Sequence, residues 1–338
     1  MPARTRYPDL MRLPSLDEIR AAQEIVQQHM RPTPQYTWPL LNQRLGTEAW
    51  IKHENHTPIG AFKIRGALVY VHGLCQSRPG LAGVIAATRG NHGQGVATAA
   101  RAFGLKAKIV VPLGNSVEKN RAMRAQGAEL IEYGHDFQAS LEHAREIAVR
   151  EHLALVESFH EWLVMGTATY AVEFFEGAPE LDAVYVPIGL GSSICGVAAA
   201  RNSLGRRTAI VGVTAAESPS YALSFQQRRV VEAPANARIA DGLACRVPHP
   251  DAVEVILANV DRVLQIPEVE IVQAMRAYYE DTHNLAEGAG AAALAGALHE
   301  REKLRGTRIG VVLTGSNVDR EVYAEILNLS EDTAAVSL

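Results

Sequence analysis

The fold class is decided by residues 83–103, which read GVIAATRGNHGQGVATAARAF. The apolar run Gly83–Ala87 is short and contains β-branched residues, as a buried strand would. A turn of polar residues and glycine follows, and Gly93–Phe103 then shows the spacing of an amphipathic helix. We therefore predict a strand, a turn at its carboxyl end and a helix.

The same alternation of strand and helix continues along the chain from about residue 65. Further helices are predicted at Val117–Gln126 and Phe137–His152. Further strands are predicted at Lys108–Val111, Glu129–Tyr133, Leu153–Val156, Ala183–Ile188, Ala209–Thr214, Val263–Ile266 and Arg308–Leu313. Strands joined through helices run parallel and are covered on both faces. The prediction is an α/β protein with two open, twisted, mostly parallel sheets and flanking helices.

The N-terminal part of the chain carries a helix signal and then a set of breaks. Ser15 and Glu18 have the spacing of a capping box, and apolar residues follow them at helical intervals, so a helix is expected to begin at Ser15. The prolines that come next predict an irregular connection, and they are Pro32, Pro34 and Pro39.

Length and composition exclude several classes of protein. The chain has 338 residues, which suits two domains, and 47% apolar with 21% charged residues suits a folded globular protein. The formal net charge of -4 argues against a dedicated nucleic-acid or membrane-surface binder, and we expect neither partner.

Targeting signals and cysteines point to a reducing compartment. The longest apolar stretch, Gly288–Leu298, is too short to span a bilayer, and the N-terminal MPARTRYPDLMRLPS has no apolar core of a secretory signal. Cys75, Cys195 and Cys245 lie far apart and are odd in number, so they form no disulfide framework. We predict a cytoplasmic protein.

Polar or glycine residues follow four of the predicted strands, where ligands of open α/β sheets bind. These segments are 88–92 (TRGNH), 189–193 (GLGSS), 214–217 (TAAE) and 314–317 (TGSN). A fifth segment, 60–66 (GAFKIRG), precedes the first clear helix of the alternating series. Chemistry is expected at these five places.

The segment 189–196 follows a strand and opens a helix. Its backbone N–H groups and the hydroxyls of Ser192 and Ser193 suit a phosphate group. Ile194 stands where the dinucleotide fingerprint needs glycine, which counts against a NAD-dependent dehydrogenase. An ordinary turn with a serine cap is the alternative.

Three polar segments allow a structural and a chemical interpretation. Lys63 has apolar neighbours that would lower the pKa of its amine, although most lysines are solvated surface groups, and Arg65 suits a structural ion pair. Asn91 and His92 suit a helix N-terminus with an incidental histidine. Arg89, at a strand end, suits a carboxylate.

Five other polar residues have plain structural interpretations. Thr314 and Asn317 suit helix caps. His53 and His56 have a loose metal-ligand spacing but no third ligand, so we interpret them as part of a solvated loop. Cys195, in an apolar helical pattern, suits packing.

Taken together, the motifs resemble those of the serine/threonine dehydratases, which are fold-type II pyridoxal-phosphate enzymes related to serine racemase. Residues 52–55 (KHEN) and 57–67 (TPIGAFKIRGA) resemble the lysine motif of that family. Five further blocks follow in the expected order, namely GNHGQG (90–95), VPIGLGS (186–192), ADGL (240–243), EGAGA (287–291) and TGSNVD (314–319). The resemblance covers about residues 30 to 320, and six ordered blocks are far more specific than any one.

The resemblance implies a cofactor, pyridoxal 5'-phosphate, and a role for each matching residue. Lys63 would form the Schiff base with the cofactor and act as the catalytic base. The residues implied to bind the cofactor are Phe62, Lys63, Asn91, Gly189, Leu190, Gly191, Ser192, Ser193, Glu287 and Thr314. The turn implied to take the substrate carboxylate consists of Thr88, Arg89, Gly90, Asn91 and His92.

The resemblance also implies an activity and an architecture. The expected reaction is the dehydration of a 3-hydroxy amino acid, by default L-threonine or L-serine, to a 2-oxo acid and ammonia. The alternatives are 3-hydroxyaspartate or a 3-aryl serine as substrate and, in another class, a non-catalytic homologue that only binds the cofactor. Residues 1–64 and 157–338 would form the large, cofactor-binding domain, with a small domain at 65–156. The resemblance is to the short, catabolic type of the family, without a C-terminal regulatory domain. A homodimer or homotetramer is expected.

The chain departs from the family pattern in three places. Leu190, Ser192 and Ser193 interrupt what is usually a run of glycines, so we expect a changed phosphate loop. Arg89 stands where the racemases carry a serine that acts as acid and base, and a guanidinium is a poor proton shuttle, so racemisation is not expected. Leu223 replaces a carboxylate partner of Glu217, so we expect no metal.

Overall fold

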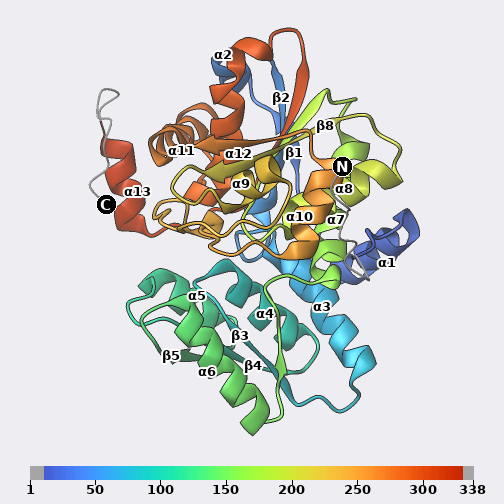
Figure 1. Cartoon of the computed structure of the whole chain (residues 1–338), viewed down its shortest axis with the longest axis vertical. Helices are drawn as coiled ribbons and strands as arrows, with labels where there is room; N and C mark the ends of the chain where they lie inside the picture. Colours follow the sequence, from blue (N-terminus) through green and yellow to red (C-terminus); the bar gives the residue numbers. More distant parts are fainter. Residues whose placement is uncertain (1–10, 330–338) are drawn as a thin grey trace.

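Two sheets organise residues 11–329, which are the residues that this computed structural model describes (Figure 1). The larger sheet runs in the order β1 (Gln35–Thr37), β2 (Glu48–His53), β10 (Arg308–Leu313), β7 (Ala183–Pro187), β8 (Ala209–Ala215) and β9 (Arg262–Ile266). The smaller sheet runs in the order β5 (Glu129–Glu132), β4 (Lys106–Val111), β3 (Gly83–Ala87) and β6 (Ala154–Leu155). Every pair of neighbours is parallel except β1 with β2. The predicted fold class is confirmed.

Helices connect the strands and cover the sheets. Around the smaller sheet lie α4 (Asn91–Ala102), α5 (Val117–Ala125) and α6 (Phe137–Arg150). The other helices are α1 (Leu16–Gln27), α2 (Pro39–Leu45), α3 (Lys63–Ser77), α7 (Glu161–Gly177), α8 (Ser192–Ser203), α9 (Ser220–Gln227), α10 (Pro250–Asn259), α11 (Glu268–Thr282), α12 (Gly288–His299) and α13 (Arg320–Asn328). Three short 3-10 turns are η1 (Glu54–His56), η2 (Asp241–Leu243) and η3 (Arg301–Lys303).

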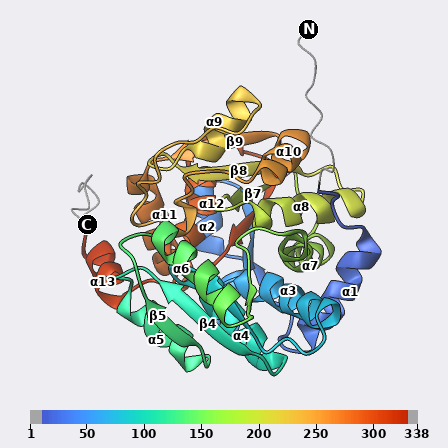
Figure 2. The ribbon, with the colours of Figure 1, turned by 60° about the horizontal axis from the view of Figure 1, so that its bottom comes forward.

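The molecule has a larger half, built on the six-stranded sheet, and a smaller half, built on the four-stranded sheet (Figure 1). Helix α3 joins these two halves. It packs against α4 on one side and α7 on the other, as Figure 2 shows. Its residues from Ile64 to Val71 are all buried, so its first two turns are fixed by neighbours on both sides. The residue at the start of α3 therefore lies at the junction of the two halves.

Most predicted elements agree with the structure because their signals are local. The capping box predicted at Ser15 and Glu18 is present, with the Ser15 side chain accepting from the Glu18 N–H. Strands β3 and β7 are buried at every residue, which is why their apolar runs could be recognised. The prediction that the N-terminal residues 1–15 hold no secretory signal falls partly on residues 1–10, which lie outside the described residues.

The prediction of an irregular connection after the prolines is wrong. The chain there forms β1, α2 and β2. Pro39 is the first residue of α2, a position that needs no N–H donor, and Gly46 ends this helix with φ of 70°. Strand β1 has only three residues, and β2 reads EAWIKH, so neither forms the continuous apolar run by which the other strands were recognised.

The prediction of a solvated loop for His53 and His56 is also wrong for His53. The His53 ring is buried, accepts from Trp38 Nε1 at 3.1 Å and stacks on His56 at 5.0 Å between ring centroids. Burial lowers the pKa of His53 to about 4, so the ring is neutral at neutral pH. His53 is a packed residue at the end of β2.

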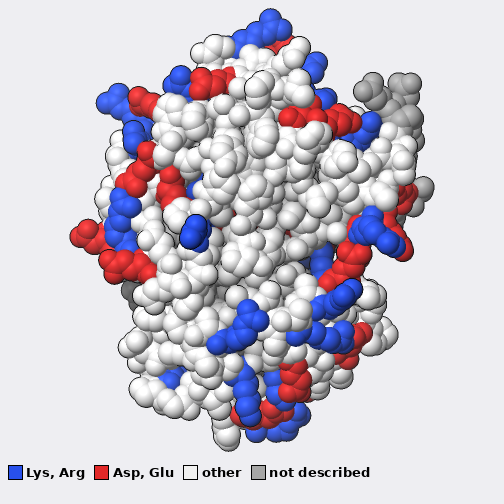
Figure 3. All heavy atoms as spheres, turned by 180° about the vertical axis from the view of Figure 1, so that it is seen from behind, with Lys and Arg blue, Asp and Glu red and all other residues white. Residues whose placement is uncertain are grey.

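The surface matches the nearly balanced charge of the sequence. On the face seen in Figure 3, basic and acidic side chains are interspersed around the edges, and the middle of the larger half is mostly uncharged. No helix within residues 11–329 is both long and apolar enough to cross a membrane. The three cysteines are free, and Cys195 is a buried core residue of α8, which confirms its predicted packing role.

Beneath the start of α3 lies a buried cluster of four charged side chains. Arg65 donates from Nε to Glu54 at 2.7 Å and from Nη1 to Glu173 at 2.8 Å. Lys52 donates to Glu173 at 2.8 Å and to the Thr33 carbonyl at 2.9 Å. Two cations meet two carboxylates, so the cluster is neutral as a whole, and it ties β2, η1, α3 and α7 together. The predicted structural ion pair of Arg65 is confirmed.

We expect Arg65→Met to lower the free energy of unfolding by about 3–5 kcal/mol, because it leaves Glu54 and Glu173 with one cation between them. Urea denaturation of the two proteins measures the difference. The matched control is Arg78→Met at the exposed end of the same helix, which should change stability by less than about 0.5 kcal/mol. Equal stabilities of Arg65→Met and wild type would contradict this account of the cluster.

Candidate functional site

The segment before α3 is held against the end of β10. The Phe62 N–H donates to the Thr314 carbonyl at 3.0 Å, and the Ser316 N–H donates to the Gly60 carbonyl at 2.9 Å. Ala61 and Gly315 form an isolated antiparallel bridge between these contacts. Lys63 is therefore the first residue of α3 and lies at the carboxyl end of the central strand β10.

The Lys63 amine lies in a partly apolar environment. Its Nζ is 4.9 Å from the centroid of the Phe62 ring. Burial lowers the pKa of Lys63 to about 8, while the charge of Glu287 acts in the opposite direction. Because this value is below the ordinary one of 10.5, more of the amine is unprotonated at neutral pH than in a solvated lysine. The lowered pKa that the apolar neighbours predicted is present.

The turn between β7 and α8 has the structure of an anion site. Gly191 is the N-cap of α8, with φ of 99°, and no acidic residue lies in the first turn. No hydrogen bond between described residues takes up the N–H groups of Ser192, Ser193 or Ile194. Gly189 is required by close packing, since a Cβ there would lie 2.4 Å from the Gly242 carbonyl oxygen. Three free N–H groups at the positive end of a helix attract a negative group.

Side chains connect this turn to the segment that carries Lys63. The Ser193 hydroxyl and the Tyr170 hydroxyl are 2.7 Å apart, and the Tyr170 ring meets the Phe62 ring edge-on at 6.3 Å between centroids. The Leu190 carbonyl accepts from the Tyr221 hydroxyl at 2.9 Å. Tyr170 therefore links the predicted phosphate loop to the segment that carries Lys63.

A hydrogen-bonded chain of three side chains spans the two halves of the molecule. Asn91, the first residue of α4, donates to Glu287 at 2.6 Å and accepts from Asn317 at 2.8 Å. Glu287 is buried at the start of α12, and burial raises its pKa to about 7, opposed by the charge of Lys119. The predicted cap role of Asn317 is wrong, since its side chain serves Asn91 and the Ile59 carbonyl.

Thr314 is buried at the end of β10 with its hydroxyl almost free. The only hydrogen bond that this hydroxyl makes among the described residues is a long one of 3.4 Å to the Ala289 carbonyl. The predicted cap role of Thr314 is therefore wrong too. A neutral, buried hydroxyl at the end of β10 can therefore pair with a further polar atom.

The turn Thr88–His92 forms the N-terminus of α4. The Gly90 N–H donates to the Thr88 hydroxyl at 3.1 Å, whereas no described residue accepts from the N–H groups of 91, 92 or 93. Burial lowers the pKa of His92 to about 3, and its Nε2 is buried without a hydrogen-bond partner. The charge of Lys63 also acts on His92, so the two residues share one environment. Arg89 is exposed.

A hollow of about 310 Å³ opens beside this turn, between the two halves of the molecule. It is lined by Arg89, by Lys119 at the start of α5 and by Asp241 of η2. Lys119 and Asp241 form an ion pair at 2.7 Å across the opening. No sequence motif predicted Lys119, whereas Asp241 belongs to the ADGL block.

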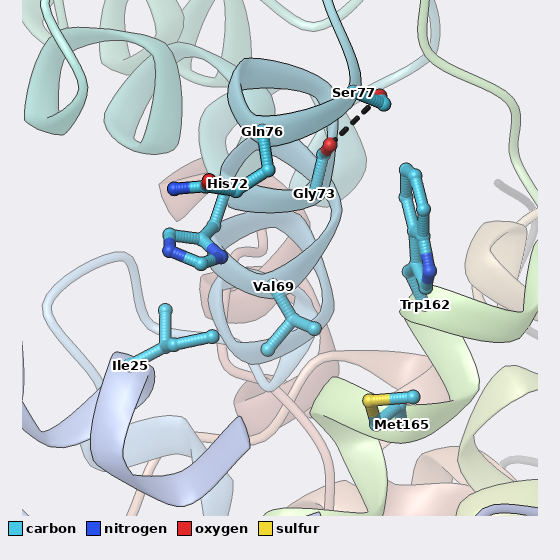
Figure 4. A pocket seen from close by; sticks show the side chains of 8 residues that line it. All are labelled: Ile25, Val69, His72, Gly73, Gln76, Ser77, Trp162 and Met165. Carbon is cyan, nitrogen blue, oxygen red and sulfur yellow. Dashed lines mark hydrogen bonds between the residues drawn. The ribbon is translucent and has the colours of Figure 1, made fainter. Parts of the chain in front are cut away.

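A larger hollow, of about 380 Å³, lies away from these residues. Figure 4 shows Ile25 of α1, Val69 of α3 and Met165 of α7 lining it, with Trp162 at one side. Its polar groups are His72, Gln76 and Ser77, the last bonded to the Gly73 carbonyl at 2.8 Å, and no predicted site residue reaches it (Figure 4). Size alone does not identify the site.

Glu217 has the surroundings of a structural carboxylate. One of its oxygens accepts from the Glu268 N–H at 3.2 Å, and the other is buried without a hydrogen-bond partner. Leu223 supplies no oxygen ligand. Within residues 11–329, no group of three His, Cys, Asp or Glu side chains is arranged to hold a metal ion.

Comparison with known proteins gives a consistent picture. The pattern of the pyridoxal-phosphate dependent enzymes matches residues 26–315 of this chain. The L-threonine ammonia-lyase of Thermotoga maritima is 31% identical over 93% of this chain and 78% of the relative. The L-threo-3-hydroxyaspartate ammonia-lyase of Saccharomyces cerevisiae is 32% identical over 95% of this chain and 99% of the relative. The structure of maize serine racemase has a TM-score of 0.87 at 27% identity, covering 92% of this chain and 96% of that one.

We expect Glu287→Gln to flatten the dependence of stability on pH. The folded protein holds the Glu287 proton up to a pKa of about 7, whereas the unfolded chain releases it near 4.5, so this stabilisation is lost as pH rises through that window. Glutamine can still accept from Asn91. Between pH 5 and pH 8, urea denaturation should show wild type losing about 1–3 kcal/mol more than the variant. Parallel curves would contradict the raised pKa.

Proposed function

The chain belongs to the family of pyridoxal-phosphate dependent enzymes, and from this premise we propose that it is an ammonia-lyase acting on a 3-hydroxy amino acid, by default L-threonine or L-serine. It is a pyridoxal-phosphate-dependent lyase of fold type II. One observation supports this substrate class. The Lys63 amine, the anion-binding start of α8 and a second turn with free N–H groups, at the start of α4, lie at one junction.

The residues present fit the cofactor in three chemical respects. The free N–H groups at the start of α8, with no acidic neighbour, suit a phosphate dianion. The Lys63 amine, with its pKa lowered to about 8, suits attachment to an aldehyde. The Thr314 hydroxyl, buried and almost free, suits the uncharged nitrogen of a pyridine ring.

We assign roles to the site residues on this basis. Gly189, Leu190, Gly191, Ser192 and Ser193 would hold the phosphate. Lys63 would carry the cofactor, with Phe62 beside the ring, Asn91 at the 3′ oxygen, Glu287 behind Asn91 and Thr314 at the ring nitrogen. The support is their convergence through the contacts described above.

The cofactor, when bound, supplies an electron sink for the charge left at Cα once the Cα proton is removed. Lys63 is the residue placed to take that proton, because a pKa of about 8 leaves a useful fraction of free amine at neutral pH. The Cα–H and Cβ–O bonds break and the hydroxyl leaves as water. One water is then taken up on hydrolysis, so the net products are the 2-oxo acid and ammonia.

The turn Thr88–His92 would hold the substrate carboxylate. Its N–H groups at 91, 92 and 93 lie at the positive end of α4 and have no described acceptor. His92 stays neutral, since its pKa is about 3, and so adds no competing charge near Lys63. Arg89 is always charged and cannot shuttle a proton, which supports elimination over racemisation.

The sequence analysis left open two other substrates and one other class of protein, a homologue that binds the cofactor without catalysis. The relatives that act on threonine and on 3-hydroxyaspartate are nearly equally similar to this chain, so overall similarity does not choose between them. A 3-aryl serine has no separate support. A homologue that binds the cofactor without catalysis is disfavoured, because Lys63, Asn91 and Thr314 are all in place.

Assembly, compartment and domain boundaries stay predictions. We propose a homodimer or homotetramer in the cytoplasm, acting in amino-acid catabolism, with three free cysteines as the supporting observation for the compartment. The small domain is proposed at residues 65–156, with strands β3 to β6 inside these limits. The substrate is a small molecule, and we propose no nucleic-acid or membrane partner.

The purified holoenzyme should convert L-threonine or L-serine to a 2-oxo acid, and Lys63→Ala should lower this rate by about 10²–10⁴-fold or more, because the variant lacks the proton acceptor. The rate of 2-oxo acid formation measures the effect, and circular dichroism checks the fold. Lys106→Ala, at an exposed lysine of β4, is the matched control and should keep its rate. No 2-oxo acid from wild type with any 3-hydroxy amino acid would refute the proposed function.

A further inference from the structure

More cationic than acidic side chains line the hollow beside the Thr88–His92 turn. Three cationic side chains line it, Arg89, Lys119 and Arg238, and His135 adds an imidazole. The acidic side chain among the lining residues is Asp241. The hollow has contributions from both halves of the molecule, and it adjoins the turn that leads into Asn91.

Among the residues that line this hollow, Arg89 has no hydrogen-bond or ion-pair partner within residues 11–329. Asp241 is taken by Lys119 at 2.7 Å, which neutralises that pair. Arg89 is exposed and makes no hydrogen bond or ion pair with any described residue. A guanidinium presents its N–H donors as a planar fork that matches a carboxylate. Arg89 is therefore a free carboxylate-binding group in the hollow beside the Thr88–His92 turn.

A ligand that binds both to the N–H groups at the start of α4 and to Arg89 needs two carboxylate groups. The N–H groups at the start of α4 already suit the carboxylate that every amino acid carries. Arg89 comes two residues before Asn91, in the same turn but as a separate set of donors. A hydroxyl or aryl side chain would leave a guanidinium facing an uncharged group, whereas a side-chain carboxylate would pair with it.

We propose that Arg89 selects 3-hydroxy amino acids whose side chain ends in a carboxylate, the class of which 3-hydroxyaspartate is the smallest member. This inference rests on the ammonia-lyase function proposed above and narrows its substrate. Lys119, through its pair with Asp241, keeps the only carboxylate of the lining from competing for Arg89. The reaction itself is unchanged, and its net products are a dicarboxylic 2-oxo acid and ammonia.

The first test compares three substrates on wild type, Arg89→Gln and Arg89→Lys. For each protein, kcat/KM is measured with L-threonine and with L-threo- and L-erythro-3-hydroxyaspartate. Wild type should prefer a 3-hydroxyaspartate, and Arg89→Gln should lower the ratio of acidic substrate to threonine by about tenfold or more. Arg89→Lys should restore part of that ratio. Arg145→Gln, at an exposed arginine of α6 outside the hollow, is the matched control and should leave the ratio unchanged.

The second test measures binding without turnover. Absorption titrations of the holoenzyme with L-aspartate and L-alanine compare ligands with and without a side-chain carboxylate, neither of which has a 3-hydroxyl to lose. Wild type should bind L-aspartate about tenfold or more tightly than L-alanine, and Arg89→Gln should remove most of this difference.

The outcomes separate this inference from the proposed function. Equal losses on threonine and 3-hydroxyaspartate in Arg89→Gln would overturn the inference and leave the ammonia-lyase function standing. No turnover of any 3-hydroxy amino acid would refute the function, and the titrations would then still decide whether Arg89 reads a second carboxylate. Equal binding of L-aspartate and L-alanine by wild type would overturn the inference on its own.

Discussion

The buried ion cluster around Arg65 is the constraint on which the rest of the site depends. Charges taken out of water are tolerated only where each one is paired, and here two cations and two carboxylates balance. A shift of the first turn of α3 would separate Arg65 from Glu54 and Glu173 together. Because Lys63 is two residues before Arg65, the position of its amine is fixed by contacts that take no part in the chemistry.

Polar groups at the carboxyl ends of several strands lie around this fixed point, at the junction of the two halves. The strand β10 ends at Thr314, β7 ends at the free N–H groups of α8, and β3 ends at the turn into α4. Burial acts on each titratable group according to its charge, lowering the pKa of Lys63 and raising that of Glu287. The two changes bring the amine and the carboxyl into the range near neutral pH, where proton transfer is most useful.

The elements predicted from the sequence are those whose signals lie in neighbouring residues. Contacts between residues far apart in the chain were not predicted. The strands Gly83–Ala87 and Arg308–Leu313 were predicted with the bounds that the structure has, because each is a continuous apolar run bounded by turn residues. The strands on either side of Pro39 were missed, because β1 has only three residues and β2 reads EAWIKH, with charged or polar residues at both ends in place of a continuous apolar run. The partners of Asn91 could not be predicted from spacing, because Glu287 lies 196 residues away and Asn317 lies 226 away.

Identification of the lysine that carries the cofactor tests most directly whether Lys63 is the centre of the site. The holoenzyme is treated with sodium borohydride, which makes the link between lysine and cofactor permanent, and the modified peptide is identified by mass spectrometry. We predict that the label lies on Lys63. A label on Lys119, the other amine at this junction, or on no lysine at all, would show that the start of α3 is not the centre of the site.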